Sequence, residues 1–111
     1  MTTLRRSDLE AEIARARRRY AWLLAELAEA LEAPCTWELL EEALCWHVVL
    51  RDALEPDVDV EVLEEALIVR ADAADRMRQA LLPVPPAFDV SRARIRFESG
   101  VLEIRVQRRR S

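Results

Sequence analysis

The sequence predicts an α+β protein in which one long N-terminal helix is followed by antiparallel strands. The first 33 residues contain neither glycine nor proline, and their apolar residues recur at helical spacing. The C-terminal stretch RARIRFESGVLEIRVQ instead alternates apolar and charged residues with a period of two, which is typical of a half-buried strand pair. With 111 residues, the chain can bury roughly 65% of its unfolded surface, which is enough for a single core.

The N-terminal helix is expected to begin at a capping box and to continue to about Pro34. SDLE, from Ser7 to Glu10, has the form in which a Ser hydroxyl and a Glu carboxylate satisfy free amides of the first turn. Trp22, Leu24 and Leu31 widen the apolar stripe beyond what a two-stranded coiled coil needs. The other apolar residues step by four and three along a coiled-coil seam, which comprises Leu9, Ile13, Ala16, Tyr20, Leu23, Leu27 and Ala30.

Two interpretations of this apolar stripe remain open. The helix packs on the rest of its own domain, or it pairs with another copy of the chain or with a client. The basic run RARRR, from Arg15 to Arg19, is expected to be a solvated face, because Glu10, Glu12 and Glu26 lie on nearby turns.

The pentamer LEEAL occurs twice, and its strong helix formers conflict with its neighbours. The second copy, Leu63 to Leu67, follows the alternating VDVEV and precedes IVRA, so we predict a charged bend between two strands. The first copy, Leu40 to Leu44, is balanced between a bend and a helix that starts at Thr36. Residue preferences alone do not decide it.

The C-terminal hairpin is the clearest strand prediction. Gly100 is the only glycine of the chain, and it falls in the short connection, where a left-handed residue is needed. We expect the arginines of the hairpin to face water and its apolar residues to face a core; these are Ala93, Ile95, Phe97, Leu102, Ile104 and Val106.

The composition argues against several function classes. One histidine and two cysteines (His47, Cys35 and Cys45) give no nucleophile–base constellation and too few ligands for a structural zinc site, so we expect neither an enzyme nor a metal or cofactor site. Two cysteines are also too few for a disulfide framework. With no apolar run of about 20 residues and no signal core, we expect a cytoplasmic protein with no membrane partner.

The charge is divided between two parts of the chain. Residues 34–75 carry a net charge of −10 and residues 76–111 a net charge of +6. Parts of opposite charge often fold against each other, so we expect no nucleic-acid partner.

After Pro34 the segments WEL–LEEA–LCWHVVL, VDVEV–LEEA–LIVRA, MRQALLP and RARIRFESGVLEIRVQ resemble, in this order, the α-crystallin domain of the small heat-shock proteins. The resemblance covers about residues 35–107. It implies an antiparallel β-sandwich of about seven strands, with residues 1–34 as the helix and residues 108–111 as a basic tail, and it makes the first LEEAL a bend as well. Only residues 72–76 separate LIVRA from MRQALLP, so the loop with a swapped strand is missing. That shortness is shared with the CS-domain co-chaperones, a related alternative.

The resemblance implies an ATP-independent chaperone (holdase) or co-chaperone that binds apolar segments of unfolded or partly folded proteins. A homo-oligomer, if it forms, would associate through the helix. The alternative is a non-chaperone adaptor whose sandwich docks one partner while the helix forms a specific coiled coil. We expect the binding surface on the helix and in a groove between VDVEV and RARIRF, formed by Tyr20, Trp22, Leu24, Leu27 and Leu31, and by Val58, Val60, Val62, Ile95 and Phe97.

Overall fold

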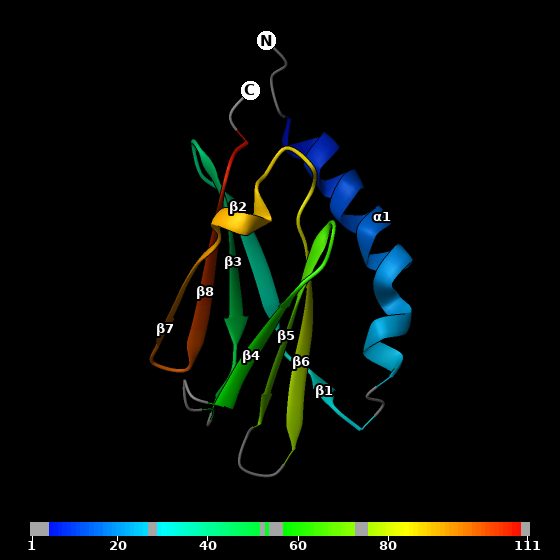
Figure 1. The fold of residues 1–111 in the computed structure, drawn as a ribbon, viewed down its shortest axis with the longest axis vertical. Helices are drawn as coiled ribbons and strands as arrows, with labels where there is room; N and C mark the ends of the chain where they lie inside the picture. The colour runs from blue at the N-terminus through cyan, green and yellow to red at the C-terminus, as the bar shows by residue number, and fades with distance from the viewer. Residues whose placement is uncertain (1–4, 27–28, 52, 54–56, 73–75, 110–111) are drawn as a thin grey trace.

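A computed structural model of the chain describes residues 5–26, 29–51, 53, 57–72 and 76–109. In these ranges, one α-helix precedes eight strands arranged in two four-stranded sheets, as Figure 1 shows. This arrangement confirms the predicted helix and antiparallel sandwich. The elements are α1 (Arg6–Ala25), β1 (Leu31–Glu32), β2 (Cys35–Leu39), β3 (Ala43–Val49), β4 (Val58–Val62), β5 (Ala66–Asp72), β6 (Met77–Pro83), the 3-10 helix η2 (Val90–Arg92), β7 (Arg94–Glu98) and β8 (Val101–Gln107).

The two sheets have the strand orders β1-β6-β5-β4 and β2-β3-β8-β7. All neighbouring strands are antiparallel except β1, which runs parallel to β6. The inner faces of the two sheets form one core, in which Trp46, Leu82 and Ile104 are fully buried. The Trp46 indole Nε1 donates a hydrogen bond of 3.0 Å to the Pro83 carbonyl, which links β3 to the opposite sheet.

Both LEEAL pentamers contain the predicted bend, which is formed by their first three residues, while their last two residues begin the next strand. β2 ends at Leu39 and β3 begins at Ala43, while β4 ends at Val62 and β5 begins at Ala66. In the second bend, the Leu63 amide donates to the Ala66 carbonyl at 2.8 Å, and the first bend repeats this bond. Pairing with neighbouring strands therefore outweighs the helix preference of the pentamer, which is worth only a few tenths of a kcal/mol per residue.

The C-terminal hairpin is also confirmed, with one correction. Its turn places Ser99 and Gly100 at φ values of +52° and +77°, so the one glycine occupies a left-handed position. On β8 the apolar residues are buried, as predicted. Ile95 on β7, however, is 53% exposed, so its predicted place in the core is wrong. β7 is the last strand of its sheet and lies at the margin of the core.

The limits of the helix differ from the prediction at both ends. α1 begins at Arg6 with Arg5 as N-cap, and no side chain caps it, so the predicted capping by Ser7 is wrong. The helix ends at Ala25 rather than near Pro34. Leu31 pairs with Arg78 as part of β1, a strand that the sequence did not predict.

The apolar stripe of α1 packs on its own sandwich, which was the first of the two interpretations. Leu9 and Ile13 belong to the main core, where they are 0% and 4% exposed. Further along the helix, Tyr20, Leu23 and Leu24 pack against the outer face of the β1-β6-β5-β4 sheet, on Ala66, Ile68 and Leu81.

Polar contacts from the sheet hold the last turn of α1. Arg70 Nη2 donates to the Leu23 carbonyl at 3.3 Å, and Gln79 Nε2 donates to the Leu24 carbonyl at 2.7 Å. Arg19 Nη1 also lies 3.2 Å from Glu65 Oε2, in the second LEEAL bend.

The first two basic residues after β8 are bonded to the sandwich. Arg108 forms an isolated antiparallel bridge with Phe88, and the Arg109 amide donates to the Ala87 carbonyl at 2.7 Å. Arg108 and Arg109 of the expected tail are therefore bonded to the sandwich, and residues 110–111 lie outside the described ranges.

Candidate interaction surface

β4 and β7, one edge strand from each sheet, carry five apolar side chains that point to the inner faces of the sandwich. Val60 pairs with the buried Val69, and Ile95 pairs with the buried Ile104, so strand alternation turns these side chains inward. We call the set formed by Val58, Val60, Val62, Ile95 and Phe97 the apolar margin. All five residues were predicted from the sequence to form a binding groove, and the structure places all five at the ends of the two sheets.

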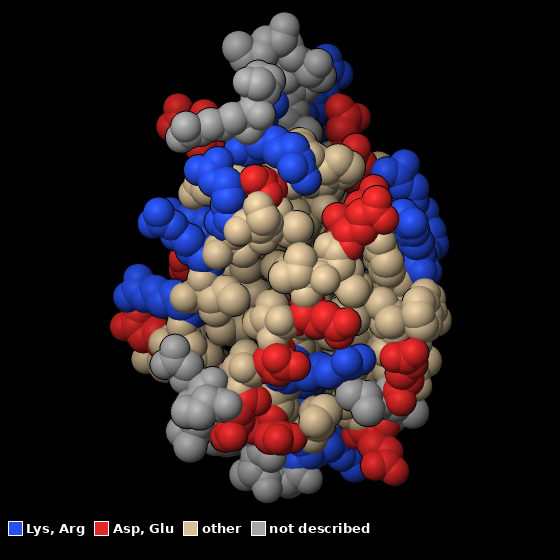
Figure 2. Space-filling view, viewed as in Figure 1, with Lys and Arg blue, Asp and Glu red and all other residues tan. Residues whose placement is uncertain are grey.

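The apolar margin is only partly covered. Val62 and Ile95 are 56% and 53% exposed, whereas Val58, Val60 and Phe97 are half-buried and pack against the core. In Figure 2, acidic and basic side chains lie over the lower parts of β4 and β5, and uncharged side chains lie above them in the middle of this face. Basic side chains border the face on the β7 side. Apolar surface with a charged rim is typical of a protein-interaction site.

The backbones of β4 and β7 are available for pairing along one side. In the ranges that the structure describes, β4 is hydrogen-bonded only to β5, and β7 only to β8. An edge strand presents free amides and carbonyls, which an extended peptide can pair with by strand addition. The margin therefore combines apolar side chains with backbone groups suited to an extended segment.

The residues predicted on the helix have different positions. Tyr20 and Leu24 pack on the sheet, so they are not free for a client. Trp22 is 59% exposed, and Leu31 is 39% exposed in β1. Leu27 lies outside the described residues. The helix therefore offers one large exposed aromatic side chain rather than an apolar stripe.

The three residues that the sequence suggested as incomplete metal ligands do not converge. Cys35 packs against the main core and is 3.6 Å from Arg17 Nη2, whereas Cys45 and His47 lie on the outer face of β3. Burial raises the pKa of both thiols, although Arg17 beside Cys35 and Arg105 beside Cys45 partly oppose the effect. A carboxylate that the sequence did not suggest, Glu103 of β8, lies with Cys45 and His47 instead.

The fold is that of solved small heat-shock proteins. Heat shock protein 16.0 from Schizosaccharomyces pombe matches with a TM-score of 0.66 and 12% identity, over 85% of this chain and 86% of that one. HspA from Xanthomonas axonopodis matches with a TM-score of 0.64 and 15% identity, over 70% and 94%. HSP18.5 from E. histolytica matches with a TM-score of 0.63 and 12% identity, over 71% and 89%.

Comparison by sequence identifies no further relative. No family model matches the chain, and no curated protein matches it significantly. Among the described residues, no helix is both long and apolar enough to cross a bilayer. The resemblance to small heat-shock proteins stated from the sequence is thus supported at the level of the fold.

Proposed function

We propose that this protein is an ATP-independent chaperone of the small heat-shock type that acts in the cytoplasm. It holds apolar segments of unfolded or partly folded proteins at the apolar margin, by binding and without catalysis. The observation that carries the proposal is the exposure of Val62 and Ile95 on two edge strands. The likeness to solved small heat-shock proteins supports it at the level of the fold.

A holdase needs apolar surface that is accessible to clients but does not drive self-aggregation. On the margin, the exposed Val62 follows Glu61, and Ile95 lies between Arg94 and Arg96. Charged residues on an edge strand disfavour pairing between identical strands, because like charges are then brought together. An extended apolar segment without such charges meets no equivalent repulsion, so the margin would favour unfolded clients over a second copy.

Self-association through the helix is a separate part of this proposal. The seam residues Leu9, Ile13 and Ala16 are buried on the chain's own sandwich, so they are not available to a partner helix. A homo-oligomer that uses α1 would therefore have to use its exposed side, where Trp22 is the largest apolar side chain.

The test is suppression of the heat aggregation of a fragile client, followed by light scattering. We expect the wild-type protein to suppress scattering and the double variant Val62→Ser/Ile95→Ser to need several-fold more protein for the same effect. Both side chains are more than half exposed, so the fold should tolerate the change. Trp22→Ser is the matched control, since Trp22 is equally exposed but lies on α1, and it should keep full activity.

The outcomes distinguish the proposal from two alternatives, a client surface on the helix and a non-chaperone adaptor. Absence of suppression by the wild-type protein at several-fold excess would overturn the chaperone proposal. Loss of activity in Trp22→Ser alone would place the client surface on the helix. A stoichiometric complex with one folded protein, together with indifference to unfolded clients, would favour the adaptor alternative.

A further inference from the structure

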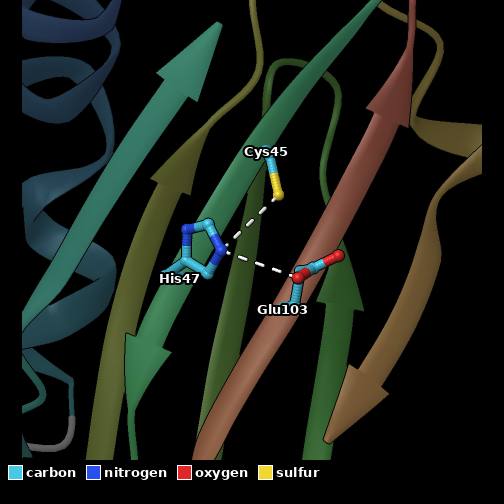
Figure 3. Close-up of side chains that lie close together, drawn as sticks. All are labelled: Cys45, His47 and Glu103. Atoms are coloured by element: carbon cyan, nitrogen blue, oxygen red, sulfur yellow. Dashed lines mark hydrogen bonds and ion pairs between the residues drawn. The ribbon is translucent and has the colours of Figure 1, made fainter. Parts of the chain in front are cut away.

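A group of three potential metal ligands lies on the outer face of the β2-β3-β8-β7 sheet. Cys45 and His47 are two residues apart on β3, so they point to the same face, and His47 pairs with Glu103 of β8. Figure 3 shows the three side chains turned toward one another. His47 Nε2 lies 3.8 Å from Cys45 Sγ and 3.6 Å from Glu103 Oε2. All three donor atoms lie within 4.8 Å of one another.

We propose that Cys45, His47 and Glu103 bind one Zn²⁺ ion. Zinc is bound in proteins by thiolate, imidazole and carboxylate groups at roughly 2.0–2.3 Å, which sets the ligand atoms of a tetrahedral site roughly 3.3–3.6 Å apart. The 3.8 and 3.6 Å separations are within a few tenths of an ångström of this geometry. Two of the three separations therefore already suit the ion, and side-chain rotation has to bring Cys45 Sγ and the Glu103 carboxylate, which lie within 4.8 Å, to the same distance.

The sheet holds the ligands in place before the ion binds. β3 is paired on both sides, with β2 and β8, and β8 lies between β3 and β7. The ligands thus stand on two central strands of one sheet, and Cys45 is 2% exposed. Ligands fixed in this way lose little conformational entropy on binding, which favours affinity.

The surroundings leave room for a fourth ligand. A surface pocket of about 260 Å³ adjoins His47 and Glu103 and is also lined by Arg96 and Glu98. A zinc site with three protein ligands completes its coordination with water or another small ligand, and the pocket is large enough for either.

The charges near the site come from three strands: β2, β7 and β8. Arg96 of β7 is paired with Glu103, and its guanidinium forms an ion pair with Glu98. Arg105 Nη2 lies 3.8 Å from Glu103 Oε1 and must yield part of this contact to the ion. Its side chain is 44% exposed, so it can turn into solvent. Glu38 of β2 pairs with Cys45 and adds negative charge to the same face, which favours a cation.

The zinc proposal does not rest on the chaperone proposal. The three ligands lie on the outer face of the sheet, whereas Ile95 and Phe97 of the apolar margin point to the inner face. It replaces the expectation of no metal site, which considered Cys35 as the third ligand and did not include Glu103.

The test uses the reduced, metal-free full chain titrated with Co²⁺ and then with Zn²⁺. We expect one equivalent of Co²⁺ to produce the near-ultraviolet absorption of a cobalt–thiolate bond, and Zn²⁺ to remove this absorption by displacement. Competition with a chromophoric chelator gives the zinc affinity. Cys45→Ser should abolish the absorption, and His47→Gln and Glu103→Gln should each weaken zinc binding by at least about tenfold.

Cys35→Ser is the matched control, because it removes the other thiol and leaves the proposed ligands in place. It should bind both metals like the wild-type protein. Loss of binding in Cys35→Ser, or an unchanged cobalt absorption in Cys45→Ser, would overturn the assignment. So would a wild-type protein that shows no cobalt–thiolate absorption. The two more exposed ligands, His47 and Glu103, keep the test decisive if Cys45→Ser does not fold.

Discussion

The core of the sandwich is covered to different degrees on two of its sides. One side is covered by α1, and the other is the apolar margin on β4 and β7. On the α1 side, Leu9 is fully buried among core residues, and the guanidinium of Arg17 lies 5.5 Å from the ring centre of Trp46. On the margin, Val62 and Ile95 are more than half exposed. Both sides present apolar side chains from inner faces, but among the described residues only the α1 side is covered. The comparison indicates that the fold can leave the apolar margin partly exposed because α1 covers apolar side chains elsewhere on the sandwich.

The largest expected effect comes from loosening the side that α1 covers. Leu9→Ala should lower the free energy of unfolding by about 2–5 kcal/mol, because it leaves a cavity between α1 and the sandwich. Urea unfolding followed by circular dichroism measures this loss. Val62→Ala on the open margin is the control and should cost no more than about 1 kcal/mol. Equal losses in the two variants would mean that the two sides do not differ in this way.

A smaller effect is expected from the bond between the sheets. Trp46→Phe keeps a large ring but removes the donor to the Pro83 carbonyl, which is buried, so stability should fall by about 1–3 kcal/mol. The same urea measurement applies. Trp22→Phe, at a position 59% exposed, should leave stability unchanged within error. An unchanged free energy of unfolding in Trp46→Phe would show that this part of the core depends on packing and not on the hydrogen bond.

The smallest effect concerns the ion pair between α1 and the second LEEAL bend. Arg19 and Glu65 are 58% and 27% exposed, so solvent and salt screen their attraction. A double-mutant cycle with Arg19→Ala and Glu65→Ala should give a coupling of about 0.5 kcal/mol or less, decreasing at high salt. The Arg6–Glu10 pair within the helix provides a matched cycle. A coupling well above 1 kcal/mol would make the ion pair, rather than apolar packing, the anchor of the helix.

Much of the fold could be predicted from local patterns. Helical spacing of apolar residues predicted α1, and alternation with a period of two predicted β4, β5, β7 and β8. The limits of the helix could not be predicted in this way. Ser7 has the right neighbours for a capping box, but the helix begins at Arg6, two residues before the start that a Ser7 cap would give. β1 depends on pairing with Arg78 and Gln79 far along the chain.

The candidate sites, too, could be predicted from local patterns only in part. Alternation placed the five residues of the apolar margin on the correct strands, but the exposure of Val62 and Ile95 depends on β4 and β7 being at the ends of their sheets. Cys45 and His47 were considered with Cys35 as too few ligands for zinc, and their spacing of two residues on β3 puts them on one face. Glu103 was missed because only the register of β3 against β8 sets it opposite His47.

The hydrogen bonds at the end of α1 also constrain the order of events during synthesis. The carbonyls of Leu23 and Leu24 are bound by side chains that lie 47 and 55 residues later in the chain. At about 5–20 residues per second, roughly 3–11 s pass between the making of the helix and the making of its last partner. During this interval the apolar stripe of the helix has no sheet to cover it. The helix therefore gains its cover only after β5 and β6 have been synthesised.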